Sequence, residues 1–325
     1  MSGMTTTNSD LLIRAELWSN SLKDTLQDEL DAQRHVNWID FPDGNTWTIP
    51  SIGDSDVQDY VEDTAVEYTP MDVGEFQFSI TNYIQAGTYI TAKNRQDAFY
   101  AAQLEASFLP KQARAISVRM ETDILNQGQP GTPNGQTSGN LNNINGAAHR
   151  WVGGDTANSK RTLGVKDFAK VRHSLKKANV PDSNIIGIVD PSVAYHMNTL
   201  TGLSDLTYNP RWEGIVASGI DSGMTFKFNI YGIDVYESNY LPTVTASETI
   251  ATVASGSDAV CNLFFSAANG MDKPWIGSLR QAPKVDSEWN KDFQREEYVT
   301  TARWGVKLYR PENFITVLAS PDVIV

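Results

Sequence analysis

Apolar residues recur at helical spacing in three stretches of the chain. Residues 9–30 carry one at every fourth position, which predicts an amphipathic helix near the N-terminus. The longest such pattern covers residues 96–127. Pro110 lacks an N–H and crowds the preceding turn, so we expect a short helix, a break, and then a long helix over 110–127 that ends at Gly128.

The third helical stretch, residues 165–178, separates its apolar and charged positions clearly. Phe168, Val171 and Leu175 share one face, which is expected to pack against the body of the protein. The other positions carry five basic side chains: Lys166, Lys170, Arg172, Lys176 and Lys177. The outer face of this helix is therefore expected to be basic.

Shorter stretches with period-two alternation, or apolar runs bounded by turn residues, predict strands. They are residues 75–80, 185–189, 226–236 and 259–266, and a closing stretch, 298–318, expected to form two strands that meet at Arg310 and Pro311. A helix capped near Asp190, with Pro191 in its first turn, follows residues 185–189. Because strands and helices do not alternate regularly, the expected class is α+β rather than a doubly wound parallel sheet.

The stretch before the third helix, residues 128–164, is rich in Gly, Asn, Thr and Ser. It has few apolar anchors. We therefore expect a long surface loop or flap, since loops of such length are usually functional or mobile.

Composition narrows the classes of function. The 325 residues include 26 basic and 39 acidic side chains, a formal net charge of −13. Nonspecific binding of nucleic acid is therefore disfavoured, because such affinity rests on Lys and Arg that neutralise phosphates. The single cysteine, Cys261, excludes an internal disulfide and a cysteine-rich zinc site, and no apolar run reaches the ~20 residues of a membrane helix.

No motif for catalysis, cofactor binding or metal binding is found in the sequence. Asp54, Asp56 and Asp59 begin like a calcium loop, but the sixth position is not Gly and the twelfth is Ala65 rather than Glu. None of the four histidines stands in a zinc-binding pattern, and Cys261 is expected to be a small buried side chain of an apolar strand. We therefore expect no enzyme, and no catalytic, cofactor-binding or metal-binding residues.

The order of the expected elements is more informative than any single motif. An N-terminal arm and an acidic hairpin precede a long helix, and a Gly/Asn-rich flap, a second α+β unit and two closing strands follow it. The closing stretch, residues 302–314, places Arg310 and Pro311 before an apolar strand. In this order of elements, and in this Arg-Pro turn, the chain resembles the major capsid protein of tailed bacteriophages with the Hong Kong 97-type shell fold.

The resemblance implies a division of the chain into five parts. They are an N-terminal arm (1–46), an extended hairpin loop that overlaps a neighbouring subunit (47–92), a peripheral domain (93–180) with its spine helix at 110–127, an axial domain (181–290), and closing strands that return between the two domains (291–325). The resemblance also implies a function: a structural subunit that self-assembles into hexamers and pentamers of an icosahedral shell around double-stranded DNA.

Partners and location follow from the same resemblance. The main partner would be further copies of the chain, joined by portal, scaffolding or cementing proteins; packaged DNA would be close only nonspecifically, and no membrane would be involved. Assembly would take place in the cytoplasm of the bacterial host, and the product would be the virion. Two alternatives stay open: an encapsulin-type nanocompartment shell, and a soluble carbohydrate-active α+β enzyme.

Charge adds a hypothesis about how subunits meet. Residues 35–92 hold ten acidic residues and no Lys or Arg, and residues 150–177 hold eight basic and two acidic residues, which gives −10 and +6. Such patches can meet between subunits, or both can be solvated faces that promote solubility. The candidate contact residues are Asp54, Asp56, Asp59, Glu62, Asp63 and Glu67 on the acidic side and Lys166, Lys170 and Arg172 on the basic side.

Two further expectations concern assembly. As a set, six dispersed tryptophans favour protein–protein contacts, although for any single one a place in a local core is at least as well supported: Trp47, Trp151, Trp212, Trp275, Trp289 and Trp304. Some members of the resembled family are joined by isopeptide bonds that start from a lysine of the extended loop. Here residues 47–92 contain no lysine, and Lys93 is expected at the base of the loop, so cohesion is expected to be non-covalent.

Overall fold

The computed structural model describes most of the chain, with gaps. The described residues are 30, 32–40, 44, 46–52, 57, 59–60, 62–63, 65, 73–97, 101–128, 143–158, 160–199, 226–244, 259–268 and 273–321. Residues 9–29 of the helix expected over 9–30 lie outside this set, as do Asp54, Asp56, Glu67 and Trp212.

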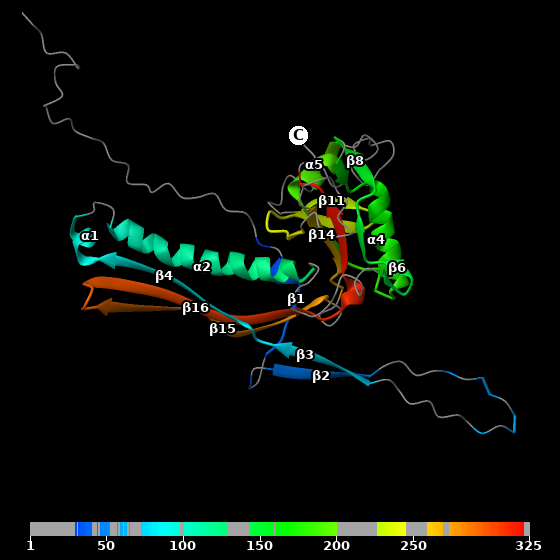
Figure 1. The fold of residues 1–325 in the computed structure, drawn as a ribbon, viewed down its shortest axis with the longest axis horizontal. Coiled ribbons are helices and arrows are strands. Elements are labelled where there is room, and N and C mark those ends of the chain that lie inside the picture. Colours follow the sequence, from blue (N-terminus) through cyan, green and yellow to red (C-terminus); the bar gives the residue numbers. More distant parts are fainter. Residues whose placement is uncertain are drawn as a thin grey trace, which may run out of the picture.

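A long four-stranded sheet with one helix on it forms the elongated part of the molecule (Figure 1). Its strand order is β1 (Val36–Trp38), β15 (Trp275–Asn290), β16 (Arg295–Leu308), β4 (Asn82–Thr91), with β1 parallel to β15 and the other pairs antiparallel. Helix α2 (Ala101–Leu125) lies along one face. The 3-10 turns η1 (Ala32–His35) and η2 (Asn126–Gly128) and the short helix α1 (Ala92–Asp97) contact α2.

Helix α2 runs through Pro110 without the break that the sequence predicts, and it starts at Ala101. Pro110 is exposed, so its ring lies on the side of α2 that faces away from the core. Further along, Ile116, Met120 and Ile124 are buried against the sheet, and this packing outweighs the local cost of the proline. The α-helix ends at Leu125, three residues before the predicted end at Gly128, and the 3-10 turn η2 covers the residues between.

A seven-stranded mixed sheet forms the core of the second unit. Its strand order is β11 (Phe226–Ile230), β12 (Ile233–Glu237), β10 (Ile185–Val189), β14 (Ala259–Ser266), β17 (Ile315–Ala319), β7 (Arg150–Val152), with β13 (Thr243–Val244) beside β14. Helices α4 (Val165–Lys177) and α5 (Pro191–Thr199) share one apolar cluster with this sheet.

Strand β10 shows why its sequence is apolar at every position. Ile185 and Val189 pack in the cluster with α4 and α5, whereas Ile186 and Ile188 pack in the cluster that contains Trp275, Trp304 and the inner face of α2. Both faces of the strand are therefore buried, which removes the alternation of polar and apolar residues. The predicted strands at 185–189 and 259–266 and the helices near 165–178 and after Asp190 are confirmed.

Two sequence predictions in this unit are wrong. Residues 226–236 form two strands, because Tyr231 and Gly232 take positive φ values of 52° and 79° and close a hairpin turn. Residues 143–162 are not loose loop but short strands: β5 (Asn143–Ile144) pairs with β6 (Ala147–Ala148), β8 (Asp155–Ala157) pairs with β9 (Lys160–Thr162), and β7 joins the large sheet. Trp151 and Leu163 anchor this stretch in the apolar cluster of α4.

Two strands belong to other sheets than the division of the chain into five parts, implied by the resemblance, would suggest. β7 joins the seven-stranded sheet although it precedes residue 181, and the 16-residue β15 joins the four-stranded sheet although it precedes residue 291. The sequence did not reveal β15, because its outer half is exposed on both faces and has no alternating pattern. The closing strands are confirmed as β16 and β17, joined through the turn η4 (Pro311–Asn313).

A hairpin of β2 (Thr46–Ile52) and β3 (Val73–Ser79) projects from the body on the side opposite to α2 (Figure 1). The expected strand at 75–80 is thereby confirmed. The expected extended loop of residues 47–92 is too long, because β4 pairs along its whole length with β16. Lys93 therefore does not lie at the base of the loop: it follows β4, at the end of the sheet that is remote from the hairpin.

Candidate assembly surfaces

An apolar cluster anchors the projecting hairpin from its root to the middle of its two strands. Phe78 and Ile80 are buried together with Ile276 of β15, and Trp47, Ile49, Phe76 and Tyr309 pack around them. The rings of Phe76 and Tyr309 meet edge to face with centroids 5.0 Å apart. Because alternate residues of β2 and β3 point to opposite sides, the other face of the hairpin is left without such packing.

Beyond β2 and β3, the described residues of the loop are exposed. They include large apolar side chains, since Val57 is 97% and Tyr60 is 85% exposed. Asp59, Glu62 and Asp63, three of the predicted acidic contact residues, are exposed as well. A loop that offers both apolar and acidic side chains to solvent has the composition of a surface for a partner.

The sheet face opposite to α2 is a second open surface, which the sequence analysis missed. Tyr83 and Tyr89 of β4 stand on it, and β16 contributes Arg295, Glu297 and Arg303, as the pairing register requires. In the sequence of β4, apolar Ile84, Ala86 and Ile90 alternate with Tyr83, Gln85 and Tyr89, and this alternation is the signal that could have identified this face.

At the end of this face near the turn between β15 and β16, charged and aromatic side chains contact one another. The Arg295 guanidinium lies 4.4 Å from the ring centre of Tyr89 and 4.7 Å from that of Phe293, and its Nε donates to Glu297 Oε1 at 2.6 Å. This hydrogen bond lowers the pKa of Glu297. Phe293 itself stays exposed in the turn between β15 and β16.

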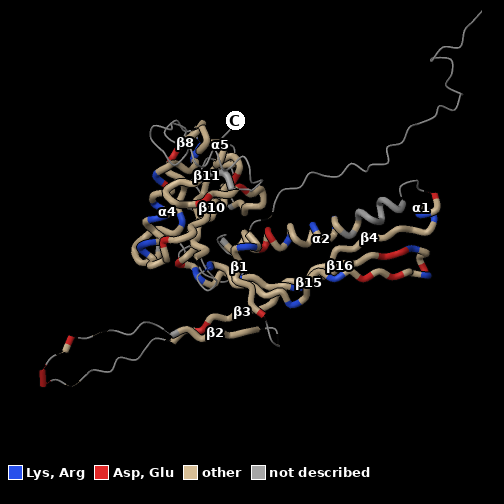
Figure 2. The backbone as a smooth tube through the Cα atoms, turned by 180° about the vertical axis from the view of Figure 1, so that it is seen from behind, with Lys and Arg blue, Asp and Glu red and all other residues tan. Residues whose placement is uncertain are grey.

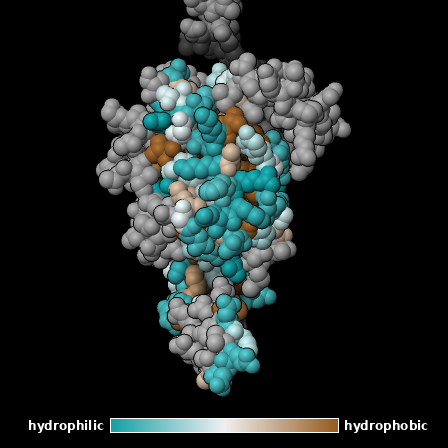
Figure 3. Space-filling view, turned by 90° about the vertical axis from the view of Figure 1, so that its right-hand side faces the viewer, coloured by the Kyte–Doolittle hydropathy of each residue, from teal (hydrophilic) through white to brown (hydrophobic). Residues whose placement is uncertain are grey.

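Helix α4 carries several Lys and Arg residues (Figure 2), and their exposure confirms the predicted basic outer face. Lys166, Lys170 and Arg172 are all exposed. Lys170 Nζ lies 4.3 Å from the centre of the Trp151 ring, and Arg172 Nη2 is 2.6 Å from Asp182 Oδ2, so both are partly engaged within the chain. The described surface on this side of the molecule is mostly hydrophilic (Figure 3).

Within the described part of the chain, the acidic and basic candidates are not brought together. No ion pair joins Asp59, Glu62 or Asp63 to Lys166, Lys170 or Arg172 among these residues. The charge hypothesis therefore concerns a contact between chains and stays a prediction.

The expectation that the tryptophans serve assembly is wrong for the most deeply placed ones. Trp275 and Trp304 are fully buried in the core beneath α2, and Trp151 packs behind α4. Trp289, in the outer half of β15, is 46% exposed and remains available for a contact.

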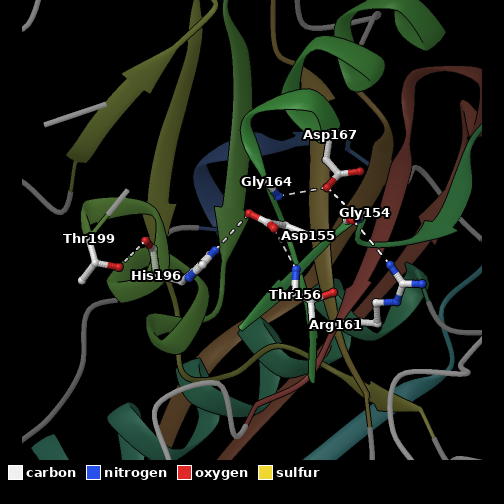
Figure 4. A network of polar contacts seen from close by, with 8 residues as sticks. All are labelled: Gly154, Asp155, Thr156, Arg161, Gly164, Asp167, His196 and Thr199. Carbon is white, nitrogen blue, oxygen red and sulfur yellow. Dashed lines mark hydrogen bonds and ion pairs between the residues drawn. The ribbon is translucent and has the colours of Figure 1, made fainter. Parts of the chain in front are cut away.

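One polar network lies between α4, α5 and the β8–β9 hairpin (Figure 4). The Asp167 carboxylate accepts from the N–H groups of Gly154 and Gly164 at 2.8 and 2.9 Å and from Trp151 Nε1 at 3.1 Å. Nearby, His196 Nε2 lies 3.3 Å from Asp155 Oδ2. Thr199 directs its hydroxyl to the backbone carbonyl of His196 rather than to the ring, so Thr199 is not positioned as a nucleophile that this pair could activate.

Another buried polar side chain, Asn262, joins strands of the seven-stranded sheet. Buried Asn262 accepts from the Asp190 N–H and donates to the Val317 carbonyl, which ties β10 and β17 to β14. Among these residues no group of three or more His, Cys, Asp or Glu side chains is arranged to hold a metal ion, and no helix is long and apolar enough to cross a membrane.

Comparison with known proteins finds similarity in structure but none in sequence. No family model matches the sequence, and no curated protein is similar to it in sequence. Among solved structures, the capsid of cyanophage P-SCSP1u matches with a TM-score of 0.66 and 12% identity, covering 97% of this chain and 94% of that one. The capsid of Ralstonia phage GP4 matches with a TM-score of 0.64 and 10% identity over 98% of both chains.

A chain from Mycobacterium phage Che8 gives a TM-score of 0.63 and 16% identity, covering 94% of this chain and 96% of that one. These matches extend over nearly the whole length of each chain, so they concern the complete arrangement of hairpin, long helix and two sheets and not one shared unit. The chain therefore has the Hong Kong 97-type shell fold found in the capsids of tailed phages.

Proposed function

We propose that this protein is the shell subunit of a phage capsid, and that it self-assembles into the hexamers and pentamers of an icosahedral shell around double-stranded DNA. Its function would be association rather than catalysis. The observation that carries the proposal is the β2–β3 hairpin, which projects from the body with only the half nearest the body packed.

The physical reason is that such a hairpin is poorly stable alone. An isolated two-stranded hairpin is marginal in water, and strand edges without a partner promote association. A second copy of the chain that covers the hairpin would bury its exposed side chains, and repetition of this head-to-tail contact around an axis closes a ring. The solved structures from cyanophage P-SCSP1u and Ralstonia phage GP4, which are capsids, support this use of the fold.

Within this proposal, the four-stranded sheet with α2 corresponds to the peripheral domain, and the seven-stranded sheet with α4 and α5 to the axial domain. The chain would be assembled in the cytoplasm of the bacterial host and would end in the virion. Portal, scaffolding or cementing proteins are proposed as additional partners.

The charge hypothesis belongs to the same proposal. The acidic side chains of the loop (Asp54, Asp56, Asp59, Glu62, Asp63 and Glu67) would lie over the basic face of α4 in the next subunit, near Lys166, Lys170 and Arg172. Exposed charge contacts weaken with salt, so shells should dissociate more at molar than at low ionic strength. Reversal of the three basic residues to Glu should weaken assembly; if neither salt nor reversal has an effect, both surfaces are solvated faces.

The proposal is tested by expressing the full chain and examining it by electron microscopy and sedimentation velocity. We expect closed particles that sediment far ahead of a single chain of 35.9 kDa. A variant in which a two-residue Asn-Gly turn replaces residues 53–72 keeps β2, β3 and the root, and it should stay monomeric with unchanged thermal unfolding. A wild-type chain that stays monodisperse and monomeric at every concentration would contradict the proposal and favour the soluble alternative.

Particles that enclose an enzyme instead of DNA would favour the encapsulin-type alternative. Nuclease-resistant DNA in particles from the natural source, or a co-purifying cargo protein, separates the two.

A further inference from the structure

The hairpin touches the four-stranded sheet at a point where only glycine fits. A Cβ atom on Gly305 of β16 would lie 2.8 Å from the carbonyl oxygen of Ser79 and 3.0 Å from the Cα of Ile80. Both are backbone atoms, so a larger residue could be accommodated only if the end of β3 moved away from the sheet.

Lys307 holds the hairpin two residues further along the same face of β16. Its Nζ donates to the backbone carbonyl of Gln77 at 2.8 Å and lies 4.9 Å from the centre of the Phe76 ring. The side chain is thus bonded to β3 and stacked on it at adjacent positions. Partial burial under the hairpin lowers the pKa of Lys307.

The backbone ladder does not fix the direction of the hairpin. β2 and β3 hydrogen-bond to one another in a two-stranded sheet and join neither larger sheet. The angle at the root therefore depends on side-chain packing around Phe78 and on the contacts of Gly305 and Lys307.

We propose that Gly305 and Lys307 act as positioning residues for assembly: together they set the angle at which the β2–β3 hairpin leaves the body, and hence where it meets a second copy of the chain. This inference rests on the proposed function. Each strand of the hairpin has seven residues, which is about 23 Å, so a change of about 10° at the root displaces the far end by about 4 Å. A displacement of this size exceeds what a close-packed contact tolerates.

The angle can be measured in the isolated full-length chain. Cys261 is fully buried, so spin labels at Thr48→Cys on β2 and Glu288→Cys on β15, both exposed positions, would be selective. The wild-type background should give one narrow distance distribution. Lys307→Met keeps the apolar stem over Phe76 but removes the ammonium group, and it should raise the undocked fraction about tenfold.

Lys284→Met is the matched control, because Lys284 lies on the neighbouring strand and is paired with Asp286 at the surface. It should leave the distribution unchanged. Gly305→Ala should shift the mean distance, since it pushes the end of β3 outward. Equal distance distributions for Lys307→Met and the wild type would show that Lys307 does not hold the hairpin at its angle.

Assembly is measured in parallel. Lys307→Met should give fewer closed particles, or particles of mixed diameter, at a thermal unfolding temperature equal to that of Lys284→Met. If the label distances broaden but the particles match the wild type in yield and diameter, the role in assembly is wrong. If the wild type forms no particles, the proposed function fails, while the distance measurement still decides whether Gly305 and Lys307 set the angle.

Discussion

Removal of the Asp167 carboxylate should destabilise the unit built on the seven-stranded sheet more than any surface substitution near it. This side chain is buried and stands at the third position of α4, where it joins the start of the helix to the turn before β8 and to the indole of Trp151. Asp167→Ala takes the acceptor from all three donors and keeps the helix backbone intact.

The magnitude follows from which donors stay buried. Trp151 and Gly164 are buried, and a buried donor without an acceptor costs about 1–3 kcal/mol, whereas Gly154 is an exposed residue whose N–H bond is only partly buried, so its loss should cost less. Loss of a negative charge in the first turn of a helix adds about 0.3–1 kcal/mol. We expect the free energy of unfolding to fall by about 3–5 kcal/mol for Asp167→Ala, and by somewhat less for Asp167→Asn, whose amide oxygen can still accept.

Urea unfolding at neutral pH, followed by tryptophan fluorescence, measures this change in monomeric protein. Asp182→Asn serves as the control, because it removes a surface ion pair with Arg172 that is worth at most about 1 kcal/mol. The Trp151 indole should also become more accessible to a quencher in Asp167→Ala only.

A loss below about 1 kcal/mol for Asp167→Ala, equal to that of the control, would refute the reasoning. It would mean that the three donors find other acceptors, or water, without cost.

Three further predictions concern single residues. Burial, and secondarily the nearby cations Lys273 and Arg34, lowers the pKa of His35 to about 4. The stability that neutral His35 contributes is therefore complete above pH 6.5 and is lost as the pH falls from 6.5 to 4. In unfolding titrations, His35→Gln should remove about 3 kcal/mol of this pH dependence. A Cβ on Gly187 would lie 2.7 Å from the Phe264 ring, so Gly187→Ala should cost about 1–3 kcal/mol in denaturant unfolding, whereas Gly87→Ala, with nothing nearer than 3.7 Å, should cost almost nothing; equal effects would contradict the overpacking argument. Pro110→Ala restores a helix N–H at an exposed position and should raise the melting temperature, and a lower melting temperature would show that the proline stabilises α2 through the unfolded chain.

Local signals in the sequence determined the elements whose packing agrees with their pattern. The amphipathic spacing of Phe168, Val171 and Leu175 predicted both α4 and its buried face, and the apolar run at 185–189 predicted β10 to the residue. The exposed lysines of α4 followed from the same periodicity. The order of elements was enough to suggest the shell fold, because this order reflects the connectivity of the chain.

Tertiary structure decided the rest, since it depends on contacts between residues far apart in sequence. Pro110 stays inside α2 because the helix is held by the sheet beneath it, and Trp275 is buried because Phe265 of β14 and Phe314 pack against its ring. β15 carries no alternation, so only its pairing with β16 makes it a strand. The contacts of Gly305 and Lys307 with the hairpin likewise cannot be predicted from the sequence. They form only because the fold brings β16 against the end of β3, and more than two hundred residues separate the two.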